Sequence, residues 1–229
     1  MLLNLLSLFR SCDFHHHDET EVLLPNPDRA DFESSVIDNE YFPLPVGATW
    51  SYEADGEDGL ETIEVEVLEE TKTIEGVEAT VVRDSAYLDG VLIEDTFDWY
   101  AQDTDGNVWY LGEDTCEYED DKCVDTHGSW MWGVDGALPG IVMWGDPEVD
   151  GQPYYQEYLE GEAEDVGEVI EEDVRVRVTA GNFHDCIKTH DTSTLDTSAD
   201  EYKYYCPGVG TVLTEEPDVD EELVSYTGL

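Results

Sequence analysis

Apolar and polar residues alternate with a period of two along this chain of 229 residues. Residues 61–67 place Ile63, Val65 and Val67 on one side of an extended backbone and polar residues on the other, and residues 174–179 repeat the pattern. Such alternation is typical of antiparallel strands with one buried face. Almost no stretch follows the period of a helix. The pattern therefore predicts an all-β protein.

Turn signals separate the extended stretches. Dipeptides that favour tight hairpin turns occur at Asp55-Gly56, Asp58-Gly59, Glu75-Gly76, Asp89-Gly90 and Asp105-Gly106. Further strand-like runs lie at residues 49–54, 77–84, 96–102, 108–112, 154–159, 184–189, 201–206 and 210–215. Short strands joined by tight turns predict an antiparallel meander that forms a barrel, a half-barrel or a sandwich.

The charge of the chain limits what it can bind. There are 58 acidic and 9 basic residues, which gives a formal net charge of −49. Nucleic acids and anionic lipids are bound by clustered Lys and Arg, so we expect neither as a partner. A hydrophobic content of 40% argues against disorder. Adaptation to high salt, which screens charges over about 3 Å at 1 M, is the first explanation, and bound cations are the second.

The beginning of the chain differs from the rest. Residues 1–12 form a short apolar run that is similar to a secretory signal, although no Lys or Arg starts it. The run ends at Cys12, where bacterial lipoproteins carry an acylated cysteine. Residues 13–38 are acidic, contain His and Pro and show no sustained periodicity, which predicts a flexible tether. Residues 39–229 are predicted to form a single all-β domain.

Four further cysteines lie in the predicted domain. Cys116 and Cys123 bracket an acidic hairpin tip, so a disulfide between them would join its two arms. Cys186 and Cys206 each lie in a strand-like stretch and would bridge neighbouring strands. Two such pairs indicate an exported protein, because disulfides persist in oxidising compartments. The alternative is a set of reduced, buried cysteines in a cytosolic domain.

Several segments carry a recognisable pattern. They read Tyr41-Phe-Pro-Leu-Pro-Val-Gly47, Asp98-Trp-Tyr-Ala-Gln-Asp103 with Asp105-Gly-Asn-Val-Trp-Tyr110, Gly136-Ala-Leu-Pro-Gly140, Gln156-Glu-Tyr158 and Lys203-Tyr-Tyr205 with Pro207-Gly-Val-Gly210. In these segments, which span residues 41–214, the chain resembles a group of uncharacterised bacterial secreted proteins and lipoproteins. The resemblance implies export and a single all-β domain, and it brings no activity with it.

The sharpest local motif is an acidic loop between two predicted strands. Asp103, Asp105 and Asn107 occupy its first, third and fifth positions, and Asp114 occupies the twelfth. Calcium loops surround their ion with oxygen ligands at such positions. Val108 stands where an EF-hand requires Gly, and no helix flanks the loop. The motif predicts a calcium site, and the alternative is a simple hairpin turn.

A second acidic cluster lies near the end of a predicted strand. The stretch from residue 124 to 174 has no Lys or Arg, and in it acids crowd together at Glu157, Glu160, Glu162, Glu164 and Asp165. Unpaired carboxylates this close raise one another's pKa or recruit a cation. The alternative is a face that is simply solvated in salty water.

A Trp-rich, Gly-rich segment is the candidate ligand site. Trp130, Trp132 and Trp144 can form a platform for a sugar ring or line the mouth of a barrel, with Glu157 nearby. The alternative is a long connection whose Trp rings plug one end of the barrel. A glycosidase also needs two carboxyls about 5 to 9.5 Å apart, and Asp135 with Glu157 is one such pair of candidates.

Together these features predict a non-enzymatic, exported β protein of a salt-adapted bacterium. It would bind a small molecule, a glycan or a protein partner, with calcium as a structural ion. It would meet a membrane only through a lipid anchor at Cys12. The alternative function is carbohydrate binding or glycoside hydrolysis on the Trp platform. No catalytic residue is assigned.

Overall fold

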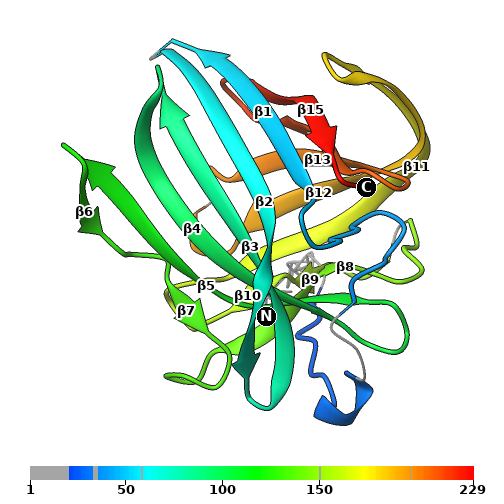
Figure 1. Ribbon diagram of the computed structural model, residues 1–229. Helices are drawn as coiled ribbons and strands as arrows, with labels where there is room; N and C mark the ends of the chain where they lie inside the picture. The colour runs from blue at the N-terminus through cyan, green and yellow to red at the C-terminus, as the bar shows by residue number, and fades with distance from the viewer. Residues whose placement is uncertain (1–20, 33–35, 58, 150, 197) are drawn as a thin grey trace, which may run out of the picture.

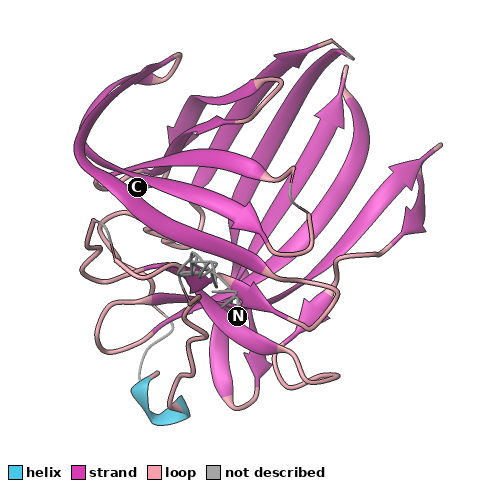
Figure 2. Ribbon diagram, turned by 180° about the vertical axis from the view of Figure 1, so that it is seen from behind, coloured by secondary structure: helices cyan, strands magenta, loops and turns pink. Residues whose placement is uncertain are grey.

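Antiparallel strands are the main secondary structure of the described chain (Figure 2). The computed structural model describes residues 21–32, 36–57, 59–149, 151–196 and 198–229. These residues form fifteen strands and one short 3-10 helix, η1 (Arg29–Asp31). Among them, no helix has the length and apolarity needed to cross a membrane. The all-β prediction is confirmed.

The strands follow one another as predicted for a meander. They are β1 (Thr49–Gly56), β2 (Gly59–Ile74), β3 (Val77–Leu88), β4 (Val91–Gln102), β5 (Val108–Glu119), β6 (Lys122–Asp125), β7 (Trp130–Met131), β8 (Leu138–Met143), β9 (Tyr154–Tyr155), β10 (Glu157–Tyr158), β11 (Asp165–Val178), β12 (Gly181–Ser193), β13 (Asp200–Cys206), β14 (Gly210–Glu215) and β15 (Asp220–Thr227). The alternating runs at residues 61–67 and 174–178 lie in β2 and β11.

The sheet bends until its two ends meet. Its order is β10-β8-β5-β4-β3-β2-β1-β15-β14-β13-β12-β11-β9, with β6 and β7 paired to β5. The terminal strands β9 and β10 are separated in the chain by Gln156 alone. The Gln156 backbone N–H donates to the Asp165 carbonyl at 2.8 Å. Figure 1 shows β1 to β5 on one side and β11 to β15 on the other. The sheet is therefore barrel-like and closes through this residue.

Closure requires a glycine on β8. A Cβ atom at Gly140 would lie 2.2 Å from the carbonyl carbon of Gln156, well inside van der Waals contact. A larger residue would push the closing segment away from β8. The last glycine of the Gly-Ala-Leu-Pro-Gly segment thus has a structural explanation.

Hydrophobic clusters lie on both faces of the strands. The inner cluster joins the two sides of the barrel and includes Trp50, Tyr52, Ile63, Val67, Val82, Val176, Ile187, Tyr205, Val212 and Leu223. The outer cluster packs on the opposite face of β3, β4 and β5 and comprises Ile74, Val77, Ala79, Val81, Trp99, Ala101, Trp109, Leu111, Trp132, Ile141 and Tyr154. Strands buried on both faces lose the simple polar alternation seen in β2.

The described part of the predicted tether is packed against the barrel. Leu23 forms a parallel bridge with Tyr154, and the Phe32 ring meets the Trp109 ring edge-on at 6.2 Å. Burial of Phe32 against the outer cluster offsets part of the chain entropy lost on ordering this segment. The folded part therefore begins earlier than residue 39. Residues 13–20 of the tether lie outside the described residues.

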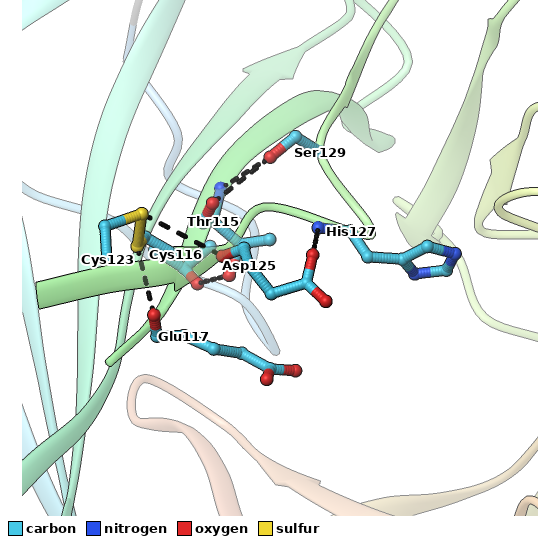
Figure 3. The surroundings of a disulfide bond; sticks show 8 residues. Thr115, Cys116, Glu117, Cys123, Asp125, His127 and Ser129 are labelled. Carbon is cyan, nitrogen blue, oxygen red and sulfur yellow. Dashed lines mark hydrogen bonds between the residues drawn. A yellow bond between two sulfur atoms is a disulfide. The ribbon is translucent and has the colours of Figure 1, made fainter. Parts of the chain in front are cut away.

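Both predicted disulfides are present. Cys116–Cys123 joins β5 to β6, and Cys186–Cys206 joins β12 to β13. Figure 3 shows the first pair beside Thr115, whose backbone N–H donates to Ser129 Oγ at 3.0 Å. Two bridges are typical of proteins from oxidising compartments. The predicted lipidation site, Cys12, lies outside the described residues.

Candidate functional site

The barrel-like sheet lines a partly open cavity of about 500 Å³. Aromatic side chains form part of its wall: Phe42, Trp50, Tyr52, Tyr100, Tyr110 and Tyr205. Carboxyl groups form another part: Asp84, Asp98, Glu113, Glu157, Asp165, Glu201, Glu216 and Glu221. Among the described residues that line the cavity, Lys203 is the one base. The cavity is therefore both aromatic and strongly acidic.

A β-bulge brings two of the lining side chains together. The pairing of β5 with β4 shifts by one residue between Tyr110 and Gly112, so Tyr110 and Glu113 face the same side despite a spacing of three. Gly112 has a φ of +135°, and a Cβ atom there would lie 2.4 Å from the Trp130 carbonyl oxygen. The bulge and the pairing with β7 both depend on this glycine.

Tyr110 links two buried acids. Its Oη atom lies 2.6 Å from Asp98 Oδ1 and 2.8 Å from Glu113 Oε2. A hydroxyl has one hydrogen to donate, so the second contact requires a proton on one of the carboxyls. Burial raises the pKa of Asp98 to about 6 and that of Glu113 to about 7, while the Tyr110 hydrogen bond opposes both shifts. The two carboxyls therefore share one proton when both contacts form.

Glu157 is the most perturbed acid with a defined value. Trp130 Nε1 donates to its Oε2 atom at 2.7 Å. Burial raises the pKa of Glu157 to about 8, and the charges of Asp165 and Glu113 add to the shift. Burial also raises the pKa of Asp165. At neutral pH Glu157 is mostly protonated, and its hydroxyl is then a hydrogen-bond donor.

Lys203 forms ion pairs with two acids. Its Nζ atom lies 3.2 Å from Asp191 Oδ2 and 3.3 Å from Glu201 Oε2. Burial is the largest single influence and lowers the pKa of Lys203, but its interactions with Asp191, Tyr205 and Glu201 together outweigh burial and hold this pKa well above its usual value. Asp191 is 5% exposed and also accepts from Gln156 Nε2 at 3.3 Å. Lys203 also lowers the pKa of Glu157, Asp165, Glu216 and Glu221, so one positive charge is shared among many cavity carboxyls.

Two further cavity acids, Asp84 on β3 and Glu221 on β15, also have perturbed pKa values. Burial, with Asp98 and Glu221 nearby, raises the pKa of Asp84 well above its usual value. Burial raises the pKa of Glu221 to about 7, which Lys203 opposes. The Thr214 side chain also lines the cavity and is 5% exposed.

Of the four residues predicted to bind a ligand, Glu157 lines the cavity. Trp130 is 4% exposed and packs edge-on against Tyr110, and Trp132 is 7% exposed in the outer cluster. Trp144 is half-buried and meets the Tyr154 ring at 5.1 Å. The three rings are thus spread over separate packing environments. The Trp130 ring still contributes, because it positions the Glu157 carboxyl.

The predicted calcium loop closes on itself. The Asp103 carboxylate accepts from the backbone N–H groups of Asp105 and Asn107 at 3.0 and 2.9 Å, from Asn107 Nδ2 at 2.9 Å and from Trp109 Nε1 at 2.8 Å. These bonds are those of a hairpin turn between β4 and β5. Asp114 is exposed on β5, opposite Phe97.

Calcium binding stays a prediction. The Asn107 side-chain carbonyl accepts from the Gly145 backbone at 2.9 Å, so it too has a protein partner. Within the described residues, no group of three or more His, Cys, Asp or Glu side chains is arranged to hold a metal ion.

Sequence reasoning missed most of the cavity acids. Asp98 and Tyr100 lie two residues apart on one face of their strand, as do Lys203 and Tyr205. A charged residue on the same face as an aromatic residue is the sequence signal that could have identified the cavity. It was obscured because acids are so frequent in this chain.

Comparisons with known proteins add little. No protein-family model and no curated protein matches this chain. A crystal structure of a candidate lipoprotein from Parabacteroides distasonis ATCC 8503 is similar, with 14% identity and a TM-score of 0.46 over 82% of this chain and 99% of that chain. A likeness of this size supports no argument about the location or activity of this protein.

Proposed function

We propose that this chain is an exported, non-enzymatic protein that binds a small molecule inside its barrel. The observation that carries the proposal is the cavity of about 500 Å³ with aromatic walls and unpaired acids. Small-molecule sites are typically apolar or aromatic hollows of roughly 300 to 1,000 Å³ with a few convergent polar groups. Buried carboxyls without a partner cost folding free energy, and a bound ligand would compensate for that cost.

Export is supported by the two disulfides. A lipid anchor at Cys12 and adaptation to high salt belong to the same proposal, since the net charge of −49 calls for screening. Thiol titration of the unreduced protein tests this part. With five cysteines and two disulfides, we expect at most one free thiol, and four or five would contradict it.

The cavity supports binding better than a Trp platform does. The alternative function, glycoside binding or hydrolysis on Trp130 and Trp132, needs ring faces that are open to a sugar. Both rings are at least nine-tenths buried by other protein groups. A sugar would therefore have to enter the cavity itself.

A thermal-shift screen tests the binding proposal. The full chain is melted in 1 M NaCl with neutral oligosaccharides, organic anions, organic cations and fatty acids. We expect at least one class to raise Tm. Val65→Trp fills the cavity, because Val65 lines it, and should abolish the shift. Glu64→Trp adds the same ring on the exposed face of β2 and should preserve it. A shift that survives Val65→Trp, or no shift at millimolar ligand, would overturn the proposal.

A further inference from the structure

Four acids of the cavity come from three parts of its wall. Asp84 and Asp98 come from β3 and β4, Glu157 comes from β10 at the closure, and Glu221 comes from β15. A single ammonium group placed beside one wall would leave the other walls without a counter-charge. Coulomb attraction falls with distance, so one small ion cannot serve all three.

A single metal ion is also a poor match. Calcium takes six to eight oxygen ligands at about 2.3 to 2.6 Å, which requires carboxylates that converge on one point. In the part of the chain that the structure describes, no three such side chains converge in this way. The acids are dispersed around a hollow instead.

The remaining wall suits the carbon chain of an organic cation. Trp50, Tyr52 and Tyr100 also line the cavity. Aromatic faces pack against methylene groups and attract ammonium groups by cation–π interaction.

Thr214 adds a polar side chain to the cavity wall. It is 5% exposed and lines the cavity. A hydroxyl oxygen can accept a hydrogen bond from an ammonium N–H. Since Lys203 is bound to Asp191 and Glu201, a positive group for these sites must come from outside the described chain.

We propose that the cavity binds a linear organic polycation of the polyamine class, whose nitrogens reach the separate acidic walls while its methylenes pack on the aromatic side chains. This inference rests on the proposed function, because it names the ligand class of the same cavity.

Spermine titration by calorimetry tests the inference. The full chain is used in 1 M NaCl, where the Debye length of about 3 Å suppresses binding to the surface charge. We expect one spermine per protein. Asp84→Asn and Thr214→Val should each weaken binding, the former by about tenfold because it removes a charged partner. Glu64→Gln removes a charge from the exposed face of β2 and should leave the affinity unchanged.

The other outcomes separate the two proposals. Equal losses in Asp84→Asn and Glu64→Gln, or several spermines per chain, would show surface binding and overturn the inference. Binding of tetramethylammonium or calcium in place of spermine would also overturn it. Suppose that spermine does not bind, while another compound of the thermal-shift screen raises Tm in a way that Val65→Trp abolishes. The proposal of a polycation ligand is then wrong, and the proposal that the cavity binds a small molecule stands. If nothing binds, both fail. Thermal melts of each variant confirm that it is folded.

Discussion

The two faces of β4 and β5 differ in chemistry although both are enclosed. On the cavity face, Asp98, Tyr110 and Glu113 form a hydrogen-bonded group with perturbed protonation. On the opposite face, Trp99 and Leu111 are 5% and 0% exposed in the outer cluster. An antiparallel sheet usually turns its polar face to water. Here the polar face is turned inward instead.

The difference shows how stability and binding are divided. The outer cluster buries large apolar side chains and stabilises the fold by the hydrophobic effect. The cavity face buries acids that oppose folding when they ionise. Residues that destabilise a fold are expected at functional sites, where they are retained for binding. The following variants test this division, from the largest expected effect to the smallest.

Leu111→Ala should be the most damaging change. Leu111 is fully buried in the outer cluster, and its loss would leave a hole among large rings. We expect the free energy of unfolding to fall by about 3 to 5 kcal/mol, as for other Leu→Ala changes in packed cores. Urea denaturation followed by circular dichroism in 1 M NaCl measures it.

Val65→Ala is the counterpart on the cavity face. Val65 is half-buried and lines the hollow, so water can occupy the space that the removed methyls leave. The expected loss is below about 1 kcal/mol. If Val65→Ala cost as much as Leu111→Ala, the division between the two faces would be wrong.

Glu157→Gln should stabilise the protein. The folded state raises the pKa of Glu157 from 4.5 to about 8, so between these values the folded state holds a proton that the unfolded state releases. Such a group makes stability fall as pH rises from about 4.5 to 8. The amide keeps an acceptor for Trp130 Nε1 and cannot ionise. We expect a gain of roughly 1 to 3 kcal/mol at pH 7.5 and little change at pH 4.5.

Urea denaturation across pH 4.5 to 8 measures this effect. Glu160→Gln is the matched control, because Glu160 is exposed and its substitution removes the same charge. The wild-type curve should decline with pH, and the Glu157→Gln curve should decline less. A gain that is equal in both variants would mean that general charge repulsion, rather than burial of Glu157, is responsible.

Tyr110→Phe should have a smaller, opposite effect. Its hydroxyl contacts both the Asp98 and the Glu113 carboxyls, and this hydrogen bonding lowers the pKa of both. Without it both pKa values rise further, so stability should fall more steeply toward pH 8. We expect a loss of about 1 kcal/mol at pH 8 and less at pH 5. Tyr226→Phe, at an exposed hydroxyl, is the control in the same urea titration. A pH-independent loss would contradict the shared-proton description.

The sequence predicted the strands and the disulfides because both depend on local patterns. Alternation in residues 61–67 marks β2, and Cys116 with Cys123 brackets a hairpin. It did not predict the cavity, because a period of two separates two faces without saying which face becomes enclosed. Enclosure depends on long-range contacts, such as the Gln156 closure at Gly140.

The Trp-rich segment also shows that local sequence patterns do not predict which side chains become buried. A Gly-rich stretch with Trp130 and Trp132 is compatible with an exposed platform or with a plug. Pairing of β7 with β5 and packing of the β2 to β3 hairpin bury these rings, and neither contact is visible in the local sequence. Acids are so frequent in this chain that the cavity acids could not be told apart from the others by sequence. Asp98 and Glu113 differ from the other acids only in the residues that surround them in the fold.

Lys72→Met should have the smallest effect and refines the description of the outer face. The Lys72 Nζ atom lies 3.1 Å from the centre of the Trp99 ring. Trp99 belongs to the outer cluster, so the lysine packs over this cluster. Methionine keeps the apolar stem and removes the cation. We expect a loss of about 0.5 to 1 kcal/mol in the free energy of unfolding.

Lys122→Met is the control, because Lys122 is exposed and contributes only attraction to the general negative charge. That attraction is screened in 1 M NaCl, whereas contact with the ring is too short to be screened. The loss should therefore persist at high salt in Lys72→Met and vanish in Lys122→Met. Equal behaviour of the two variants in urea titrations at 0.1 and 1 M NaCl would show that the outer face is stabilised by packing alone.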